Sequence, residues 1–455
     1  MSREPVVVLM EPYHAYSTAL MAIYARRYGL RTVALYTDPA ALRRQARAHP
    51  ELHGPLVAAS YLVPDGRERE LADVLAGRYA VQAVVPVFET DVAPLARLAE
   101  ELGLSWAQPG VLERFRDKGA LKEHLRPVPG GPRINVSRYA DGPDDVLAAL
   151  HDEGLARVVL KPNDGWGNQQ IGYVDPTTTR SELTAYFETL GTTRVLLEEY
   201  IGGTEYYVNG QVDERGVPHV FTVTESVRIA ANGRASVSIG DYLVRTHRPE
   251  FEAAADYTRR VVAATGLRRS PFHLELKMDE QGPCLLEVAA RFCGVNAVVR
   301  DSEAHGGLDV LGIAAHHFLL GDCYGGYPLD WSAHDAAVRG QVNGIVSFDS
   351  RVHTVDGLDQ VEAMPEFLRW ELRPDFGNHV VPTVDLVAQP WRLSVVARDE
   401  DAFFDVAQRM RDTLRINPHG SSGLRRVKEL VAYAPPVTRE LRSRVPSSLR
   451  PVRVG

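Results

Sequence analysis

The chain has 455 residues, a formal net charge of −8 at pH 7 and an apolar fraction of 45%. This length exceeds what one hydrophobic core supports, so we expect about two or three domains, and the acidic balance argues against nucleic acid as the main partner. No apolar run approaches the ~20 residues of a membrane span, and the first one is too short for a signal peptide. Three cysteines without a paired spacing offer no disulfide framework, which favours a reducing, cytoplasmic location.

The first hundred residues alternate short apolar strands with helical segments. Strands are predicted over residues 6–10, 31–36 and 83–87, and helices over 17–28 and 92–102, with Gly29 where a helix C-terminal cap belongs. Strands that alternate with helices predict a parallel, doubly wound α/β sheet.

Two acidic residues follow strands of this predicted sheet. Glu11 comes after the strand at 6–10 and Glu89 after the strand at 83–87, and ligands of parallel sheets bind beyond the carboxyl ends of the strands. Glu89 is therefore a candidate substrate residue and Glu11 a weaker one, with the capping of the following helices as the alternative role. Because no Gly-x-Gly-x-x-Gly follows residue 10, an NAD-type site is not expected.

From Asp117 onward the pattern changes to longer strands and turn-rich loops, which predicts an α+β region with antiparallel sheets. Further strands at 338–347 and 391–397 and a helix at 401–414 predict a smaller α+β subdomain. We therefore expect an N-terminal domain at 1–115, a central domain at 116–325 with a lid at about 126–200, a C-terminal subdomain at 326–432, and a surface tail at 433–455.

The sharpest chemical pattern is a predicted hairpin that carries Glu275 on one strand and Glu287 on the other. Residues two apart share a face of a strand, and a hairpin sets the two strands side by side, so these carboxylates can face each other. Opposed carboxylates repel unless a cation lies between them, and Mg²⁺ prefers one or two carboxylates with phosphate and water. The alternative is a solvent-facing pair whose charge is diluted by Lys277 and Arg291.

Three further segments suit a nucleotide. Lys161 ends a strand before a glycine-containing loop, an arrangement that can wrap a phosphate, and Lys118 opens a helix directly after Asp117. The run from Glu198 to Glu205 breaks at two glycines, so that backbone groups can meet a purine edge and Glu205 can accept from ribose. Each segment alone also fits a surface lysine, an ordinary turn or a bent strand.

Taken in order, these motifs resemble the ATP-grasp superfamily, specifically its amino-acid (dipeptide) ligase branch, over about residues 6–321. The resemblance implies an ATP-grasp fold behind a Rossmann-like N-terminal domain, with ATP and two Mg²⁺ ions (or Mn²⁺) as cofactors. It also implies the following roles: nucleotide lysines Lys118 and Lys161; a phosphate loop with Gly165 and Gly167; an adenine hinge at Glu198, Glu199 and Ile201; ribose acceptor Glu205; metal ligands Glu275 and Glu287; and Arg291 for the acyl phosphate and tetrahedral intermediate.

One position departs from the family pattern. Ala289 stands where many members carry an asparagine as a third metal ligand. A small residue at this position is familiar in the dipeptide-ligase branch. Asn296 and the His305-Gly306-Gly307 stretch follow the hairpin as candidates for the acceptor pocket, with helix capping as the alternative for the glycines.

The resemblance thus implies an ATP-dependent carboxylate–amine ligase, with Arg291 and Lys161 as catalytic residues, acting on small amino acid substrates, with a homodimer as the family habit. A ligase or carboxylase that uses bicarbonate or formate is the second hypothesis, although it would favour the missing asparagine. A nucleotide-binding regulatory protein without catalysis is the third hypothesis.

Overall fold

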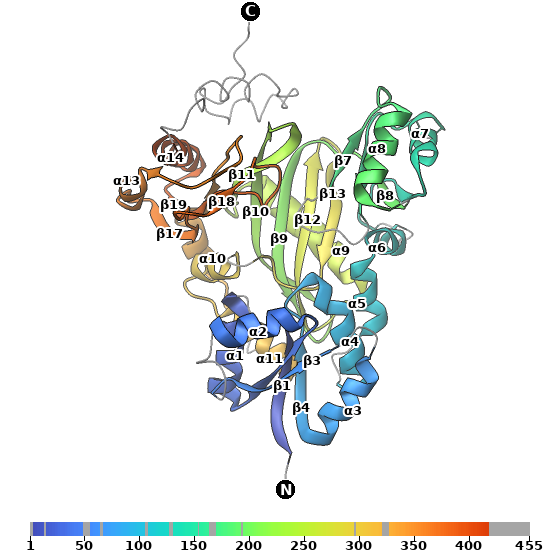
Figure 1. Ribbon diagram of the computed structural model, residues 1–455, viewed down its shortest axis with the longest axis vertical. Helices are drawn as coiled ribbons and strands as arrows, with labels where there is room; N and C mark the ends of the chain where they lie inside the picture. Colours follow the sequence, from blue (N-terminus) through green and yellow to red (C-terminus); the bar gives the residue numbers. More distant parts are fainter. Residues whose placement is uncertain are drawn as a thin grey trace, which may run out of the picture.

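The structure is a computed structural model that describes residues 3–12, 15–48, 55–63, 67–104, 108–126, 131–152, 154–162, 170–192, 194–294, 297–320 and 327–417. Figure 1 shows an N-terminal sheet below a long central sheet, with a small lid beside that sheet. The predictions for Gly165, Gly167, Asn296 and the tail at 433–455 fall outside the described residues.

The N-terminal region is the parallel α/β sheet that the sequence predicts. Its strands lie in the order β3-β2-β1-β4 and all neighbours pair in parallel. The residues from Val6 to Leu9 are fully buried on both faces of β1, as a parallel sheet covered by helices requires. The elements are β1 (Glu4–Met10), α1 (Ala15–Tyr28), β2 (Arg31–Tyr36), α2 (Pro39–Ala48), β3 (Val57–Leu62), α3 (Glu68–Arg78), β4 (Tyr79–Val85), the 3-10 turn η2 (Glu89–Asp91) and α4 (Val92–Glu101).

Two short helices, α5 (Pro109–Arg116) and α6 (Lys118–Leu125), lead from this sheet to the lid. The lid is a four-stranded antiparallel sheet in the order β5-β8-β6-β7, with two helices and an apolar core of its own. Its elements are β5 (Ser137–Ala140), α7 (Pro143–Asp152), β6 (Val158–Lys161), β7 (Gly172–Val174), α8 (Arg180–Leu190) and β8 (Val195–Glu199).

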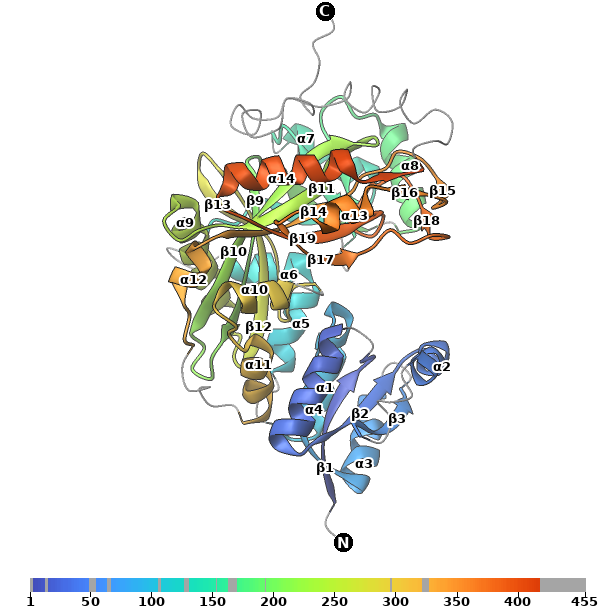
Figure 2. The same ribbon diagram turned by 90° about the vertical axis from the view of Figure 1, so that its left-hand side faces the viewer.

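The central sheet has eight strands in the order β13-β12-β9-β10-β11-β14-β19-β17, and all neighbouring strands pair antiparallel. Helix α9 packs on β9, β10, β12 and β13, and α11 returns to pack on α1 and β4 of the N-terminal sheet (Figure 2). The elements are β9 (Thr204–Val212), β10 (Pro218–Ala231), β11 (Arg234–Leu243), α9 (Pro249–Thr265), β12 (Ser270–Asp279), β13 (Gly282–Ala289), α10 (Ala297–Ala304) and α11 (Val310–Leu319).

The longer strands of the C-terminal region join the central sheet, and β15-β18 and β16-β20 form two small two-stranded sheets beside it. Strands β14, β19 and β17 continue the central sheet beyond β11, and their apolar core includes Val227, Ile239 and Tyr242 of β10 and β11. The division into domains therefore stays a prediction. The elements are α12 (Trp331–Asp335), β14 (Val338–Asn343), β15 (Ser350–Arg351), β16 (Val355–Asp356), α13 (Leu358–Glu362), β17 (Phe367–Leu372), β18 (His379–Val380), β19 (Arg392–Ala397), α14 (Glu400–Thr413) and β20 (Arg415–Ile416).

No helix within the described ranges has the length and hydropathy of a membrane span.

Candidate active site

Most of the residues singled out from the sequence meet in one pocket between the lid sheet and the central sheet. The cavity measures about 130 Å³ and takes its walls from both sheets and from the 384–386 loop of the C-terminal region. Eight of the predicted site residues line it: Lys118, Lys161, Glu198, Glu199, Ile201, Glu205, Glu275 and Glu287.

The hairpin cluster, which we define as Lys118, Glu275 and Glu287, forms the wall on β12 and β13. The strands pair in the register that sets Glu275 directly opposite Glu287, as the sequence predicts. The Glu275 and Glu287 side chains are 29% and 28% exposed, so they are not the solvent-facing pair of the alternative hypothesis. Lys118 comes from α6, and its Nζ lies 3.3 Å from a carboxylate oxygen of Glu287.

The two carboxylates of the hairpin cluster differ in their electrostatics. Burial and the charge of Glu275 raise the pKa of Glu287, and Lys118 only partly offsets this. Burial would also raise the pKa of Glu275, but a hydrogen bond and the charge of His273, with Arg228 and Lys161 nearby, lower it to about 2. Because His273 also lies 2.9 Å from the amide oxygen of Asn209, its imidazolium donates to both neighbours and fixes the Glu275 side chain.

These donors fit a divalent cation that also binds phosphate. The repulsion that raises the pKa of Glu287 is relieved by a positive charge between the two carboxylates. Over the described ranges, no three His, Cys, Asp or Glu side chains gather into a group that holds a metal by itself. A metal held by only two carboxylates takes its remaining ligands from phosphate and water, as Mg²⁺ does in nucleotide sites.

Arg291 and Glu89 are brought together although 202 residues separate them in the chain. Glu89 lies in η2 beyond the carboxyl end of β4, and Arg291 follows β13, so the ion pair joins the N-terminal sheet to the hairpin of β12 and β13. The Arg291 Nε donates to a Glu89 oxygen at 2.6 Å, while its Nη1 donates to the Phe292 carbonyl at 2.8 Å. Both side chains are 17% exposed, and the Glu89 charge reaches Glu287 and contributes to its raised pKa.

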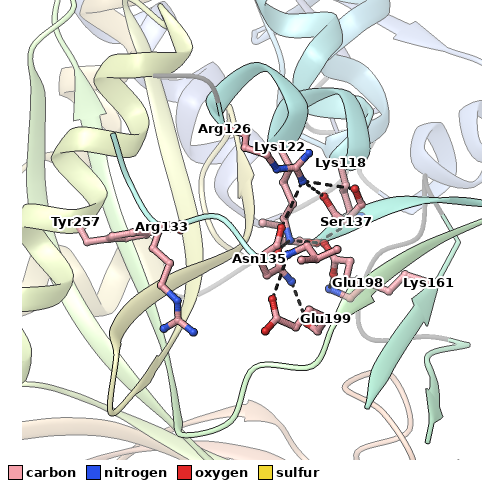
Figure 3. A network of polar contacts seen from close by, with 12 residues as sticks. Lys118, Lys122, Arg126, Arg133, Asn135, Ser137, Lys161, Glu198, Glu199 and Tyr257 are labelled. Atoms are coloured by element: carbon pink, nitrogen blue, oxygen red, sulfur yellow. Dashed lines mark hydrogen bonds and ion pairs between the residues drawn. The ribbon is translucent and has the colours of Figure 1, made fainter. Parts of the chain in front are cut away.

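The hinge cluster, which we define as Lys122, Asn135, Lys161 and Glu198, lies on the lid side of the pocket (Figure 3). The Glu198 side chain is 1% exposed and bonds to both lysines, with Lys161 Nζ at 2.5 Å from one oxygen and Lys122 on the other. Burial alone would raise the pKa of Glu198, but the two lysines lower it to about 2. Lys122 also donates to the Asn135 amide oxygen at 2.9 Å, which completes the network.

The segment after the hinge cluster turns sharply at Gly203. This residue has φ +78°, and a Cβ added there would lie 2.0 Å from the carbonyl oxygen of Met278 on β12. Ile201 is buried against the pocket, while Asn135 Nδ2 donates to the Glu199 carbonyl at 3.0 Å. The bend thus brings hinge backbone and an apolar side chain to the pocket, although contact with adenine stays a prediction.

Several residues in or next to the pocket were missed from the sequence. Lys122 has a visible signal, because it follows Lys118 by four residues and so shares a helix face with it. Arg228 of β10 bonds to Glu205, and Leu386 belongs to a loop of the C-terminal region. Neither has a local pattern that marks it, since Arg228 meets Glu205 through the pairing of β10 with β9, and Leu386 comes from a loop far along the chain.

Comparisons with known proteins agree with the family resemblance of the sequence and with the fold. The ATP-grasp domain family matches residues 157–298. Dapdiamide A synthase of Enterobacter agglomerans is 25% identical over 240 residues, which is 51% of this chain and 56% of that protein. The chain thus spans about half the length of the curated relatives it matches.

Two solved structures show the same fold. An L-amino acid ligase from Bacillus licheniformis aligns with a TM-score of 0.71 at 17% identity, covering 91% of this chain and 99% of that one. An N5-carboxyaminoimidazole ribonucleotide synthetase from Thermotoga maritima aligns with a TM-score of 0.61, also at 17% identity and the same coverage. The chain thus has the fold of these two enzymes, and its residues 157–298 match the ATP-grasp domain family.

Proposed function

We propose that the protein is an ATP-dependent carboxylate–amine ligase that joins an amino acid to an amine or a second amino acid. The observation that carries this proposal is the Glu89–Arg291 ion pair beside the opposed carboxylates of the hairpin cluster. A carboxylate next to a guanidinium presents both charges that a zwitterionic amino acid needs: Glu89 for its ammonium and Arg291 for its carboxylate.

ATP supplies the phosphoryl group, and Mg²⁺ neutralises the phosphates when both are bound. Glu275 and Glu287 are the residues that would hold the metal, and Lys118 and Lys161 the residues that would bind phosphate. An oxygen of the substrate carboxylate attacks the γ-phosphorus and ADP leaves, which gives an acyl phosphate. The amine nitrogen then attacks the acyl carbon, loses a proton, and phosphate leaves as the amide forms.

In this scheme Arg291 stabilises the charge that develops during the second step. Its guanidinium stays ionised and presents two parallel donors, which suits both the oxyanion and the departing phosphate. Glu89 aligns the guanidinium through the 2.6 Å bond to Nε and the Phe292 carbonyl accepts from Nη1, which leaves Nη2 to face other groups.

The test is release of ADP and phosphate by the full chain with ATP and MgCl₂. Amino acids are supplied singly and in pairs, with bicarbonate and formate as separate arms, and each product is identified by its mass. Turnover that requires two amino acids, or an amino acid and an amine, with loss of one water in the product mass, supports the proposal. Dependence on bicarbonate or formate favours a carboxylase or purine-type ligase, and nucleotide binding without turnover favours a regulatory protein.

A further inference from the structure

Arg228 and Glu205 are joined across two neighbouring strands at the wall of the pocket. The register sets Ser226 of β10 opposite Glu205 of β9, so Arg228 lies two residues further along β10 and reaches back diagonally. The Arg228 Nη2 lies 2.5 Å from a Glu205 oxygen, and the two side chains are 16% and 13% exposed. Both line the pocket, and Glu205 is the residue proposed above to accept from ribose.

The guanidinium is held where it can serve two parts of a nucleotide. Its Nε donates to the hydroxyl of Ser226 at 3.1 Å, which fixes the orientation of the guanidinium plane. It lines the same pocket as Glu275 and Glu287 of the hairpin cluster and also contacts Glu205. Arg228 thus stands close to both the proposed ribose acceptor and the proposed phosphate centre.

The two partners available to this arginine are unequal once a nucleotide enters. A phosphate group offers more negative charge than a carboxylate and accepts two parallel N–H bonds from a guanidinium. A carboxylate bound to an arginine, in turn, has less capacity left for the hydroxyl groups of ribose. The two contacts of the nucleotide are therefore linked through one side chain.

We propose that Arg228 is a positioning residue that couples ribose recognition to phosphate recognition. Without nucleotide the Arg228 guanidinium is paired with the Glu205 carboxylate. When a nucleotide binds, its phosphates bind the guanidinium instead, and the carboxylate can then accept hydrogen bonds from the ribose hydroxyls. The pocket then binds adenosine weakly. Adenosine must compete with Arg228 for the Glu205 carboxylate, and it has no phosphate group that could bind the guanidinium. This inference rests on the proposed function, because it requires an adenine nucleotide in this pocket.

The experiment measures the binding of ADP and of adenosine to the full chain by titration calorimetry, with wild type and Arg228→Met side by side. The expected result is a loss of roughly tenfold or more in ADP affinity together with a gain in adenosine affinity of up to about fivefold. An arginine that only stabilises the fold would weaken both ligands. Adenosine affinity that is unchanged or lower in the variant, or ADP affinity that is unchanged, overturns the proposal.

Two further variants complete the test. In a Glu205→Gln background the added Arg228→Met change should no longer improve adenosine binding, because the competition is for the Glu205 carboxylate. Arg180→Met is the matched control, since Arg180 forms an exposed pair with Asp144 on the lid at 2.8 Å and should alter neither affinity. Wild-type protein that binds no ADP refutes the proposed function itself, whereas binding that falls for both ligands in Arg228→Met refutes only the coupling.

Discussion

The hairpin cluster and the hinge cluster lie on two walls of the same pocket and handle charge in opposite ways. In the hairpin cluster two carboxylates face each other, and burial together with Glu275 raises the pKa of Glu287. In the hinge cluster Glu198 is almost completely buried, yet two lysines lower its pKa to about 2. In the proposed function a bound cation compensates the first cluster, whereas the second is compensated by its own lysines. Carboxylate charge left uncompensated by the protein points to a cation site, whereas the buried carboxylate of Glu198 is compensated within the protein.

The largest effect should follow from Glu287→Gln, which removes one charge from the hairpin cluster. We expect turnover to fall roughly a thousandfold, because the metal loses a ligand and the phosphates lose their counter-charge. Without Mg²⁺ the thermal stability should stay the same or rise, since the repulsion with Glu275 is gone. Both are measured, as steady-state turnover and as thermal unfolding in EDTA.

Glu280→Gln is the matched control for this change, because Glu280 is exposed in the turn of the same hairpin. It should leave both turnover and stability as in wild type. A Glu287→Gln variant with normal turnover, or one that unfolds much earlier in EDTA, would show that Glu287 belongs to the scaffold.

Lys122→Met should mainly lower the stability of the protein, whereas Glu287→Gln mainly lowers its turnover. Removing one lysine leaves Glu198 buried with half of its compensation, and breaking a buried ion pair from one side costs about 3–5 kcal/mol of unfolding free energy. Denaturant unfolding measures the loss. Arg126→Met, at the exposed end of the same helix, should cost less than about 1 kcal/mol. A loss of that small size in Lys122→Met would mean that Lys161 alone compensates Glu198.

The hinge cluster also predicts a pH dependence. The folded pKa of Glu198 is about 2 against an ordinary value of 4.5, so the unfolded chain binds more protons between these two values. The contribution of Glu198 is therefore fully present above pH 4.5 and is lost as the pH falls through about 2, by about 1.4 kcal/mol per pKa unit.

The measurement is unfolding free energy from pH 6 to pH 2 for wild type and Glu198→Gln. The difference between them should shrink as the pH falls through this window. A constant difference over the whole range would contradict the lowered pKa of Glu198.

The sequence predicts the hairpin cluster better than the hinge cluster, for a physical reason. The facing of Glu275 and Glu287 follows from a two-residue periodicity and one turn, which are local properties of the chain. The contact of Lys118 with Glu287 was not predicted, because the family resemblance implies only that Lys118 binds the nucleotide. The burial of Lys122 depends on Glu198, 76 residues away, and no periodicity reports such a partner.

Long-range pairing limits the rest of the prediction in the same way. The alternation of strands and helices predicts the N-terminal sheet, but not that β14, β19 and β17 extend the central one. Glu89 and Arg291 each stand out in the sequence as candidates, yet their ion pair appears only when the N-terminal sheet is placed against the hairpin. Local rules identify which residues carry chemistry, and the packing of sheets decides which of them meet.

The smallest effect tests the helix that joins the two clusters. Helix α6 carries Lys118 of the hairpin cluster and Lys122 of the hinge cluster one turn apart, and Asp117 caps it by accepting from the Ala120 amide at 2.8 Å. Asp117→Ala should cost about 1 kcal/mol of stability. It should also raise the KM for ATP severalfold, because the first turn of α6, the helix that carries both lysines, is held less firmly in place. Asp399→Ala removes the equivalent cap of α14, whose Asp399 accepts from the Ala402 amide at 2.8 Å, and should cost the same stability with no change in KM. An equal KM for the two variants would show that the lysines are held by their ion pairs alone. A difference would show that the start of α6 fixes the hairpin cluster and the hinge cluster relative to each other.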